Sequence, residues 1–73
     1  MGLDQVKLGL PVVVRRIDTD GVFKKRLRDF GLVPGTEVIC RYRTPGGSVT
    51  ALSFRGMVLA MRTRDLKKIR VQI

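Results

Sequence analysis

The chain has few side chains that could take part in acid–base, nucleophilic or redox chemistry. It has 73 residues, no histidine and a single cysteine, Cys40. Histidine is the usual general base near neutral pH, and a catalytic cysteine needs a neighbouring base to form its thiolate. The sequence also contains no P-loop and no dinucleotide-binding fingerprint. These features predict that the protein is not an enzyme.

The carboxylates do not form a convincing metal-binding pattern. Asp18, Asp20 and Asp29 have a faint resemblance to the spacing of an EF-hand loop. However, Val22 takes the fifth position of that loop, and Phe23 takes the sixth, where the loop needs glycine. We therefore expect no metal site and no cofactor. We interpret Asp20 as the N-cap of a helix.

The charge of the chain favours an acidic partner. Fifteen Lys and Arg residues against six Asp and Glu residues give a net charge of +9. Nucleic acid is one candidate, since basic residues across the chain could contact phosphates: Arg15, Arg16, Arg41, Arg43, Lys67, Lys68 and Arg70. Base stacking needs exposed aromatic rings, and the sequence pattern places all four aromatic residues in the core: Phe23, Phe30, Tyr42 and Phe54. RNA binding therefore remains the alternative reading, and so does a basic surface that only keeps the domain hydrated.

Periodicity and turn residues predict the elements that position these side chains. Apolar residues recur at helical spacing in residues 22–30, and alternation or β-branched residues mark five strands, at 10–17, 36–43, 49–55, 57–62 and 69–73. A single helical turn over 64–68, capped by Thr63, precedes the last strand. This order predicts a mainly β fold, a small five-stranded SH3-like barrel with one short helix after strand 1. We expect closure of the barrel to protect its edges. In an OB-fold, the rival plan, the helix usually lies between strands 3 and 4.

The end of the helix carries the most specific local signal. Gly31 is placed for a left-handed helix cap that folds Leu32 back on Leu27. Pro34 and Gly35 then suit the centre of a type II turn.

Residues 1–9 are predicted to be a lead-in to a single domain at 10–73. The predicted core consists of Val12, Val14, Leu27, Phe30, Val38, Cys40, Leu52, Phe54, Leu59, Met61 and Val71.

The sequence predicts a cytoplasmic protein. No secretory signal is visible, because Asp4 stands where a positive region should lie and no apolar stretch follows. The longest apolar run, residues 57–61, is far shorter than the ~20 residues of a membrane span. A single cysteine excludes an internal disulfide.

Two motifs resemble those of the FeoA family, the small cytosolic accessory proteins of bacterial ferrous iron transport. Residues 26–38 read RLRDFGLVPGTEV, where the family typically reads RLxxLGLxPGxxV. Residues 55–62 read RGMVLAMR, close to the family's RGxxLALR. The resemblance covers residues 10–73 and implies an SH3-like barrel that acts as a non-catalytic partner of the iron transporter FeoB, which has a cytosolic GTP-binding domain. The same domain occurs at the C-terminus of iron-dependent repressors, which leaves that role as a further alternative.

The predicted partner-binding surface combines one face of the helix with a neighbouring loop. Lys24, Lys25 and Arg28 lie opposite the apolar helical stripe, where they can meet an acidic surface. The loop joins two strands and consists of Thr44, Pro45, Gly46, Gly47 and Ser48. The family's loop often reads PLGDP, whereas residues 45–49 read PGGSV. Any contact that this loop makes would therefore differ here.

Overall fold

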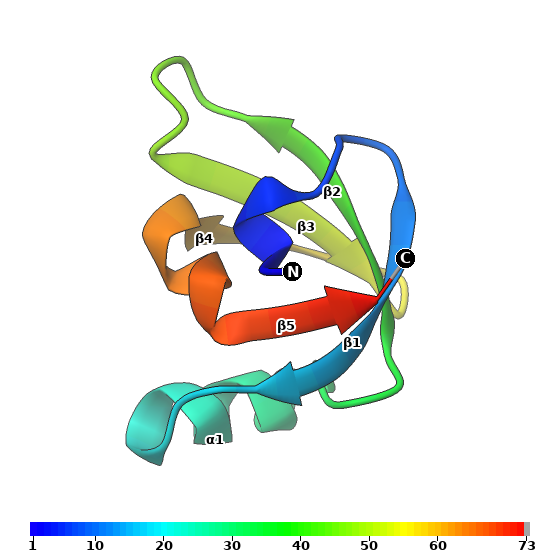
Figure 1. Ribbon diagram of the computed structural model, residues 1–73, viewed down its shortest axis with the longest axis vertical. Coiled ribbons are helices and arrows are strands. Elements are labelled where there is room, and N and C mark those ends of the chain that lie inside the picture. The colour runs from blue at the N-terminus through cyan, green and yellow to red at the C-terminus, as the bar shows by residue number, and fades with distance from the viewer. Residues whose placement is uncertain (73) are drawn as a thin grey trace.

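The computed structural model describes residues 1–72 and shows five antiparallel strands curved around one core, with a helix beside them (Figure 1). The strands are β1 (Pro11–Ile17), β2 (Glu37–Arg43), β3 (Val49–Phe54), β4 (Met57–Arg62) and β5 (Ile69–Gln72). Helix α1 (Gly21–Phe30) follows β1, and a short 3-10 helix, η2 (Thr63–Lys68), precedes β5. The mainly β plan, with its helix after the first strand, is therefore confirmed.

The strands curve like a barrel without closing completely. Their order is β4-β3-β2-β1-β5, so β4 and β5 are the two edges of the sheet. Within residues 1–72 no hydrogen-bonded ladder joins these two edges, and η2 connects them instead. The expected protection of the edges by closure is therefore incomplete, and β4 has a free edge.

Helix α1 ends as the sequence predicts. Gly31 has a left-handed backbone with φ of 90°, and its amide donates to the carbonyl of Arg28 at 3.0 Å. The Leu32 amide donates to the Leu27 carbonyl at 2.8 Å, which completes a Schellman motif. Both leucines join the buried core. At the other end of the helix, Asp20 is the N-cap residue, as predicted, although its side chain makes no capping hydrogen bond.

Two tight turns fix the directions of the strands that follow them. The Thr36 amide donates to the Val33 carbonyl at 3.0 Å, with Gly35 at φ of 95°, as the predicted type II turn requires. Between β3 and β4 the hairpin turn has two residues, and Arg55 and Gly56 both have positive φ, 50° and 77°. Positive φ at both positions is the signature of a type I′ turn, whose twist matches that of the paired strands.

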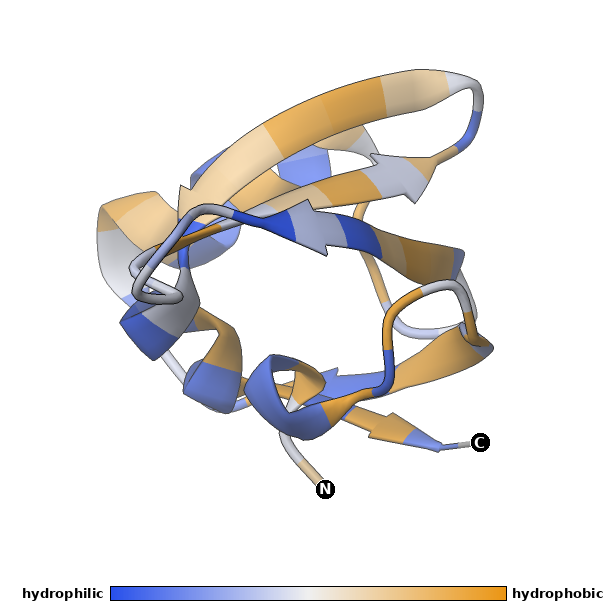
Figure 2. Ribbon diagram, turned by 90° about the horizontal axis from the view of Figure 1, so that it is seen from above, coloured by the Kyte–Doolittle hydropathy of each residue, from blue (hydrophilic) through white to orange (hydrophobic). Residues whose placement is uncertain are grey.

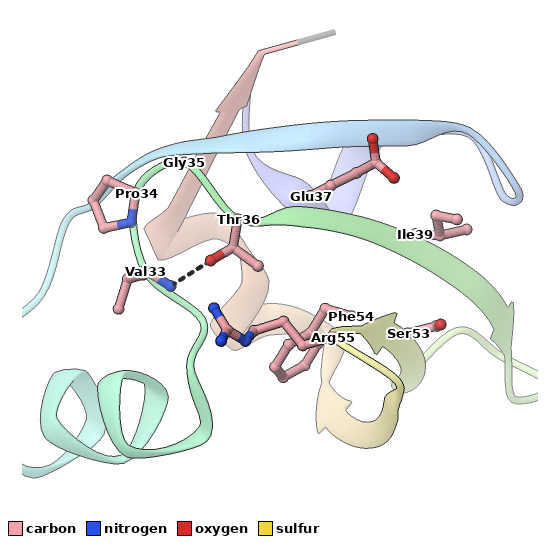
Figure 3. A pocket seen from close by; sticks show the side chains of 9 residues that line it. All are labelled: Val33, Pro34, Gly35, Thr36, Glu37, Ile39, Ser53, Phe54 and Arg55. Carbon is pink, nitrogen blue, oxygen red and sulfur yellow. Dashed lines mark hydrogen bonds between the residues drawn. The ribbon is translucent and has the colours of Figure 1, made fainter.

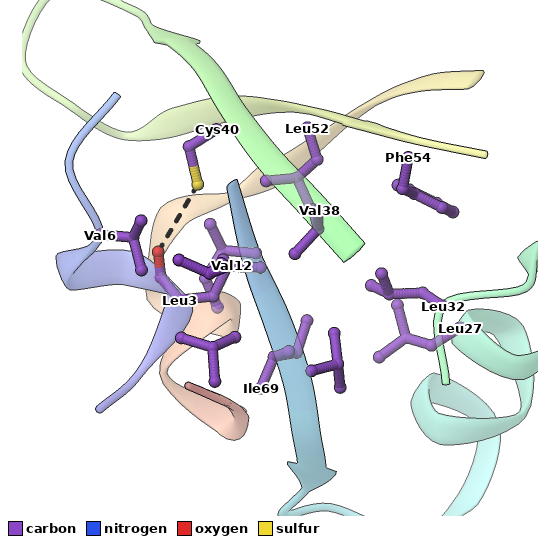
Figure 4. Packing of buried hydrophobic residues seen from close by; sticks show 13 residues of the cluster. Leu3, Val6, Val12, Leu27, Leu32, Val38, Cys40, Leu52, Phe54 and Ile69 are labelled. Carbon is purple, nitrogen blue, oxygen red and sulfur yellow. Dashed lines mark hydrogen bonds between the residues drawn. The ribbon is translucent and has the colours of Figure 1, made fainter. Parts of the chain in front are cut away.

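The core lies inside the curved sheet and includes η1 (Leu3–Gln5), a short 3-10 helix near the N-terminus (Figure 4). Eight of the predicted core residues are buried, namely Val12, Val14, Leu27, Val38, Cys40, Leu52, Phe54 and Val71. The alternation of Val12 and Val14 inward with Val13 outward fixes the register of β1. Figure 2 shows that apolar and polar stretches are interspersed along the elements that curve around this core.

Five of the residues predicted to lie in the core are less buried than expected. One of them, Phe23, is half-buried against the core, and the other four differ as follows. Tyr42 is 60% exposed because the pairing of β2 with β3 shifts by one residue between Cys40 and Tyr42, and such a bulge turns the next side chain to the opposite face. Phe30, in the last turn of α1, is 44% exposed. Leu59 and Met61 are half-buried at the edge of the core. The prediction that these four residues are core residues is therefore wrong for Tyr42 and Phe30 and only partly right for the β4 pair.

Residues 1–9 contribute to the same core. Leu3 and Val6 are buried, and the Arg43 guanidinium donates to the carbonyls of Asp4 and Val6, each at 3.1 Å. The Val71 amide donates to the Met1 carbonyl at 2.9 Å, so the segment also lies against β5. The sequence pattern had not indicated this burial, because a segment this short shows no clear periodicity.

Candidate functional site

The outer face of α1 is exposed and basic. Lys24, Lys25 and Arg28 are all exposed, as predicted, while Leu27 on the opposite side is buried. Only one acid accompanies them: Asp29 lies 3.9 Å from the Lys25 ammonium, and both side chains are more than 60% exposed. An ion pair this exposed contributes little to stability. The face therefore keeps its positive charge available to a partner.

The predicted recognition loop is an ordered turn. The Gly47 amide donates to the Thr44 carbonyl at 2.7 Å, with Pro45 and Gly46 between them and φ of 86° at Gly46. The Thr44 hydroxyl accepts a hydrogen bond from the Val49 amide at 3.1 Å. The tip of the loop, Pro45 and Gly46, is exposed. These hydrogen bonds hold the loop in one conformation, and the loop offers few polar side chains that could bind a partner.

The structure does not bring the two halves of the predicted surface together. In Figure 1, whose vertical direction is the longest axis of the molecule, the loop of residues 44–48 lies at the top and α1 at the bottom. That axis spans 29 Å. A single small contact could therefore cover one half or the other, and the helix face and the loop are separate candidate sites.

A hollow beside the end of α1 is lined by Val33, Pro34, Gly35, Thr36, Glu37, Ile39, Ser53, Phe54 and Arg55 (Figure 3). Thr36 makes its wall rigid, since its hydroxyl donates to the Gly31 carbonyl at 2.9 Å and accepts from the Val33 amide at 3.2 Å. The Arg55 side chain points toward this turn. A Cβ on Gly31 would lie 3.0 Å from the Arg55 Cδ, so the arginine packs directly on the glycine. One acid, Glu37, and one base, Arg55, line the hollow.

The single thiol is placed for packing rather than for reaction. Cys40 is fully buried, and its Sγ lies 3.7 Å from the Leu3 carbonyl, to which it donates (Figure 4). Burial raises the pKa of the Cys40 thiol, against a smaller opposing effect of Arg43. A protonated, buried thiol is a poor nucleophile and a poor metal ligand.

The acids likewise stay apart. Within residues 1–72 no group of three or more His, Cys, Asp or Glu side chains gathers at one point. Asp18 instead accepts a hydrogen bond from the Arg16 guanidinium at 2.7 Å, and this bond lowers the pKa of the carboxyl. Asp65 lies 4.0 Å from Arg62.

Sequence reasoning missed one exposed aromatic ring on the outer side of the sheet. Tyr42 lies between Arg41 and Arg43, and Arg41 is exposed, with a guanidinium 3.5 Å from the Ser53 hydroxyl to which it donates. The signal that would have placed Tyr42 outside is the bulge in β2, and alternation along a single strand cannot show a bulge.

No helix within residues 1–72 is long and apolar enough to cross a membrane.

The small, incompletely closed five-stranded barrel, with its helix after the first strand, defines an SH3-like domain. A model of the FeoA domain matches residues 1–73, and the chain belongs to the FeoA family. The family is associated with ferrous iron transport, and its domain is a non-catalytic accessory domain.

Solved structures agree with this assignment. The FeoA protein of Chlorobium tepidum is 30% identical, with a TM-score of 0.94 over 100% of this chain and 70% of its own. The iron(II) transport protein A of Clostridium thermocellum is 25% identical, with a TM-score of 0.93, and this chain spans only 45% of its length. The FeoA of Stenotrophomonas maltophilia, a procaryotic SH3 domain protein complexed with zinc, is 26% identical with a TM-score of 0.86 over 99% of this chain and 89% of its own. A comparison with curated proteins gave no match.

Proposed function

We propose that the protein is a cytoplasmic accessory protein of ferrous iron transport, which docks on the cytosolic GTP-binding part of a FeoB-type transporter. The family supports the link to iron transport. The observation that carries the docking proposal is the exposed basic face of α1, formed by Lys24, Lys25 and Arg28. A net charge of +9 draws the protein toward an acidic surface and speeds their encounter. The loop Thr44–Ser48 is a second contact at the other end of the molecule.

The test reverses the charge of the helix face. Replacing Lys24→Glu and Arg28→Glu together should weaken binding to the isolated cytosolic domain of FeoB by at least about tenfold at low salt, since several charge contacts would become repulsive. The melting temperature should stay unchanged, because both side chains are exposed. Surface plasmon resonance and thermal unfolding measure the two effects.

A matched control separates a local contact from the overall charge. Lys7→Glu with Lys67→Glu changes the net charge by the same amount at two exposed positions outside α1. If both double variants lose affinity equally, long-range attraction alone explains the binding and the helix face is not the contact. If the helix variant binds as tightly as the wild type, the docking surface lies elsewhere, and substitution of Pro45 and Gly46 tests the loop.

The exposure of Tyr42 favours a second candidate function, binding of single-stranded RNA. An aromatic ring that is 60% exposed beside Arg41 offers a base a stacking surface with a nearby positive charge. Binding to a generic polynucleotide should then weaken steeply with added salt and be lost on Tyr42→Ser. A protein-docking module would show neither effect.

A further inference from the structure

A groove between α1 and β4 is lined by apolar residues that the core covers only in part. It is lined by Phe23, Arg26, Leu27, Asp29 and Phe30 from α1, by Leu59, Ala60, Met61 and Arg62 from β4, and by Val49 and Asp65. Three residues with the character of core positions, Phe30, Leu59 and Met61, are only partly covered, and all three line this groove. An apolar strip at such a position is typical of a surface that receives another segment.

The free edge of β4 forms one wall of the groove. Phe54 and Met57 close the two-residue hairpin and are therefore a hydrogen-bonded pair. Because the ladder alternates, the backbone groups of Val58, Ala60 and Arg62 point away from β3, toward the free edge. Within residues 1–72 no strand pairs with β4 on that side. The strand also lacks proline, a bulge and lysine, the usual means of blocking an edge.

The charges at the groove leave a small positive excess, which favours an acidic occupant. Two acids, Asp29 and Asp65, and two bases, Arg26 and Arg62, line it, and Lys25 lies beside Asp29. Asp29 and Asp65 already have basic partners, Lys25 and Arg62. Arg26 has no ion pair among the residues that the structure describes, and it lines the groove. A second copy of the chain would bring another +9 charge to the same place, which opposes self-association at this edge.

We propose that this groove binds an extended segment of another protein, in which acidic and apolar residues alternate, and that the segment adds to the sheet as a further strand beside β4. Backbone hydrogen bonds to Val58, Ala60 and Arg62 would give affinity, as in other strand-addition complexes. Apolar side chains of the segment would cover Phe30, Leu59 and Met61, and its acids would face Arg26. The proposal does not depend on FeoB as the partner, since the groove lies on the opposite side of α1 from its basic face.

The first test uses capped synthetic peptides in which glutamate alternates with valine, leucine or phenylalanine, titrated into isotope-labelled protein. At least one peptide should shift the amide signals of β4 and α1 and slow hydrogen exchange at Val58, Ala60 and Arg62 by about tenfold or more when bound. The matching peptides with lysine in place of glutamate should not bind. If no acidic peptide slows exchange along β4, or if the lysine peptides bind equally well, the proposal is overturned.

Two pairs of variants then test the backbone and the apolar wall. Ala60→Pro removes an outward amide without touching the β3 ladder, and proline is tolerated on an edge strand, so it should weaken peptide binding at least about fivefold while Ala60→Val retains it. Phe30→Ser should weaken binding similarly, whereas Val22→Ser, at a position on the same helix that is 70% exposed and outside the groove, should not. Equal affinity across either pair would contradict the corresponding contact. If Ala60→Pro unfolds, the Phe30 and Val22 pair decides.

Sedimentation of the protein without peptide tests whether a second copy of the chain fills the groove instead. A concentration-dependent dimer of the wild type that Phe30→Ser abolishes would show that a second copy fills the groove, and it would overturn the proposal. A monomer over the same concentrations supports it. Failure of these experiments would leave the docking of α1 on FeoB unaffected, because that test uses the other face of the helix.

Discussion

Gly31 and Arg55 are in direct contact, and each has a backbone conformation that most residues avoid. Gly31 has φ of 90° at the helix cap, and Arg55 has φ of 50° in the hairpin turn. The arginine side chain occupies the space that a Cβ on the glycine would need. The end of α1 is therefore linked to the β3–β4 hairpin by a contact that depends on the absence of a side chain.

Gly31→Ala should lower the free energy of unfolding by about 1 kcal/mol or more, since alanine disfavours positive φ. Crowding against Arg55 should add to this loss, because the new Cβ would lie 3.0 Å from the Arg55 Cδ. Thermal and urea unfolding measure the change. Adding Arg55→Ala to the alanine variant should recover the part caused by crowding, and an unchanged midpoint for the single variant would contradict the strained conformation of the cap.

Cys40 should react with a thiol reagent such as Ellman's reagent only when the protein unfolds. Its thiol is buried, and burial raises its pKa. The folded protein therefore retains this proton to higher pH than the unfolded chain, whose thiol has a pKa of about 8.5. Stability should fall as pH rises above that value, by more in the wild type than in Cys40→Ala. Parallel slopes for the two proteins, or rapid labelling under native conditions, would contradict this assignment.

At the scale of elements, α1 is attached to the sheet by a narrow contact. Leu27 is its only buried residue, whereas Phe23 is half-buried and Phe30 is 44% exposed. The Lys68 ammonium lies 5.6 Å from the centre of the Phe23 ring and adds a cation–π contact at the start of the helix. The helix is therefore the element most easily altered by a partner.

Alanine substitutions along the helical stripe should have very unequal effects. Leu27→Ala should lower the free energy of unfolding by about 2–4 kcal/mol, because it empties a fully buried site. Phe30→Ala should cost less than about 1 kcal/mol, since nearly half of the ring is already in water. Chemical denaturation compares the two variants. Equal losses would mean that Phe30 packs more tightly than its exposure indicates.

The elements that could be predicted from sequence are those fixed by local chemistry. The cap at Gly31 and the turn at Pro34 and Gly35 depend on residues within one turn of each other, so short motifs identified them. The outward position of Tyr42 depends on a bulge that is defined by pairing with β3, and the exposure of Phe30 depends on how far α1 lies from β4. These are long-range properties that periodicity within one segment does not contain. The helix face is exposed as predicted, and so is the tip of the loop, but the distance between these two surfaces could only be known from the fold.

At the scale of the whole molecule, the distribution of ligand-type side chains predicts that the isolated protein has no tight iron site. The chain has no histidine, and its one cysteine is buried. Within residues 1–72, no group of three or more His, Cys, Asp or Glu side chains lies close enough together to hold a metal ion. Titration calorimetry with ferrous iron under anaerobic conditions should show no stoichiometric site tighter than micromolar. A single such site in the wild type that persists in Cys40→Ala would contradict the prediction and point to carboxylate ligands.

The pairing of β1 with β5 has a consequence for how the protein is made. Val14 pairs with Val71, and the Arg15 guanidinium donates to Gln72 across a separation of 57 residues. Contacts so distant in sequence form late and slow the folding of a small domain. During synthesis, β1 therefore cannot complete its pairing until almost the entire chain has been made. Until the last strand emerges, the backbone groups of β1 that bond to β5 have no partner, and the apolar surface of Leu3 is uncovered. The nascent chain is at greatest risk of aggregation in that interval, and a chaperone would be most useful then.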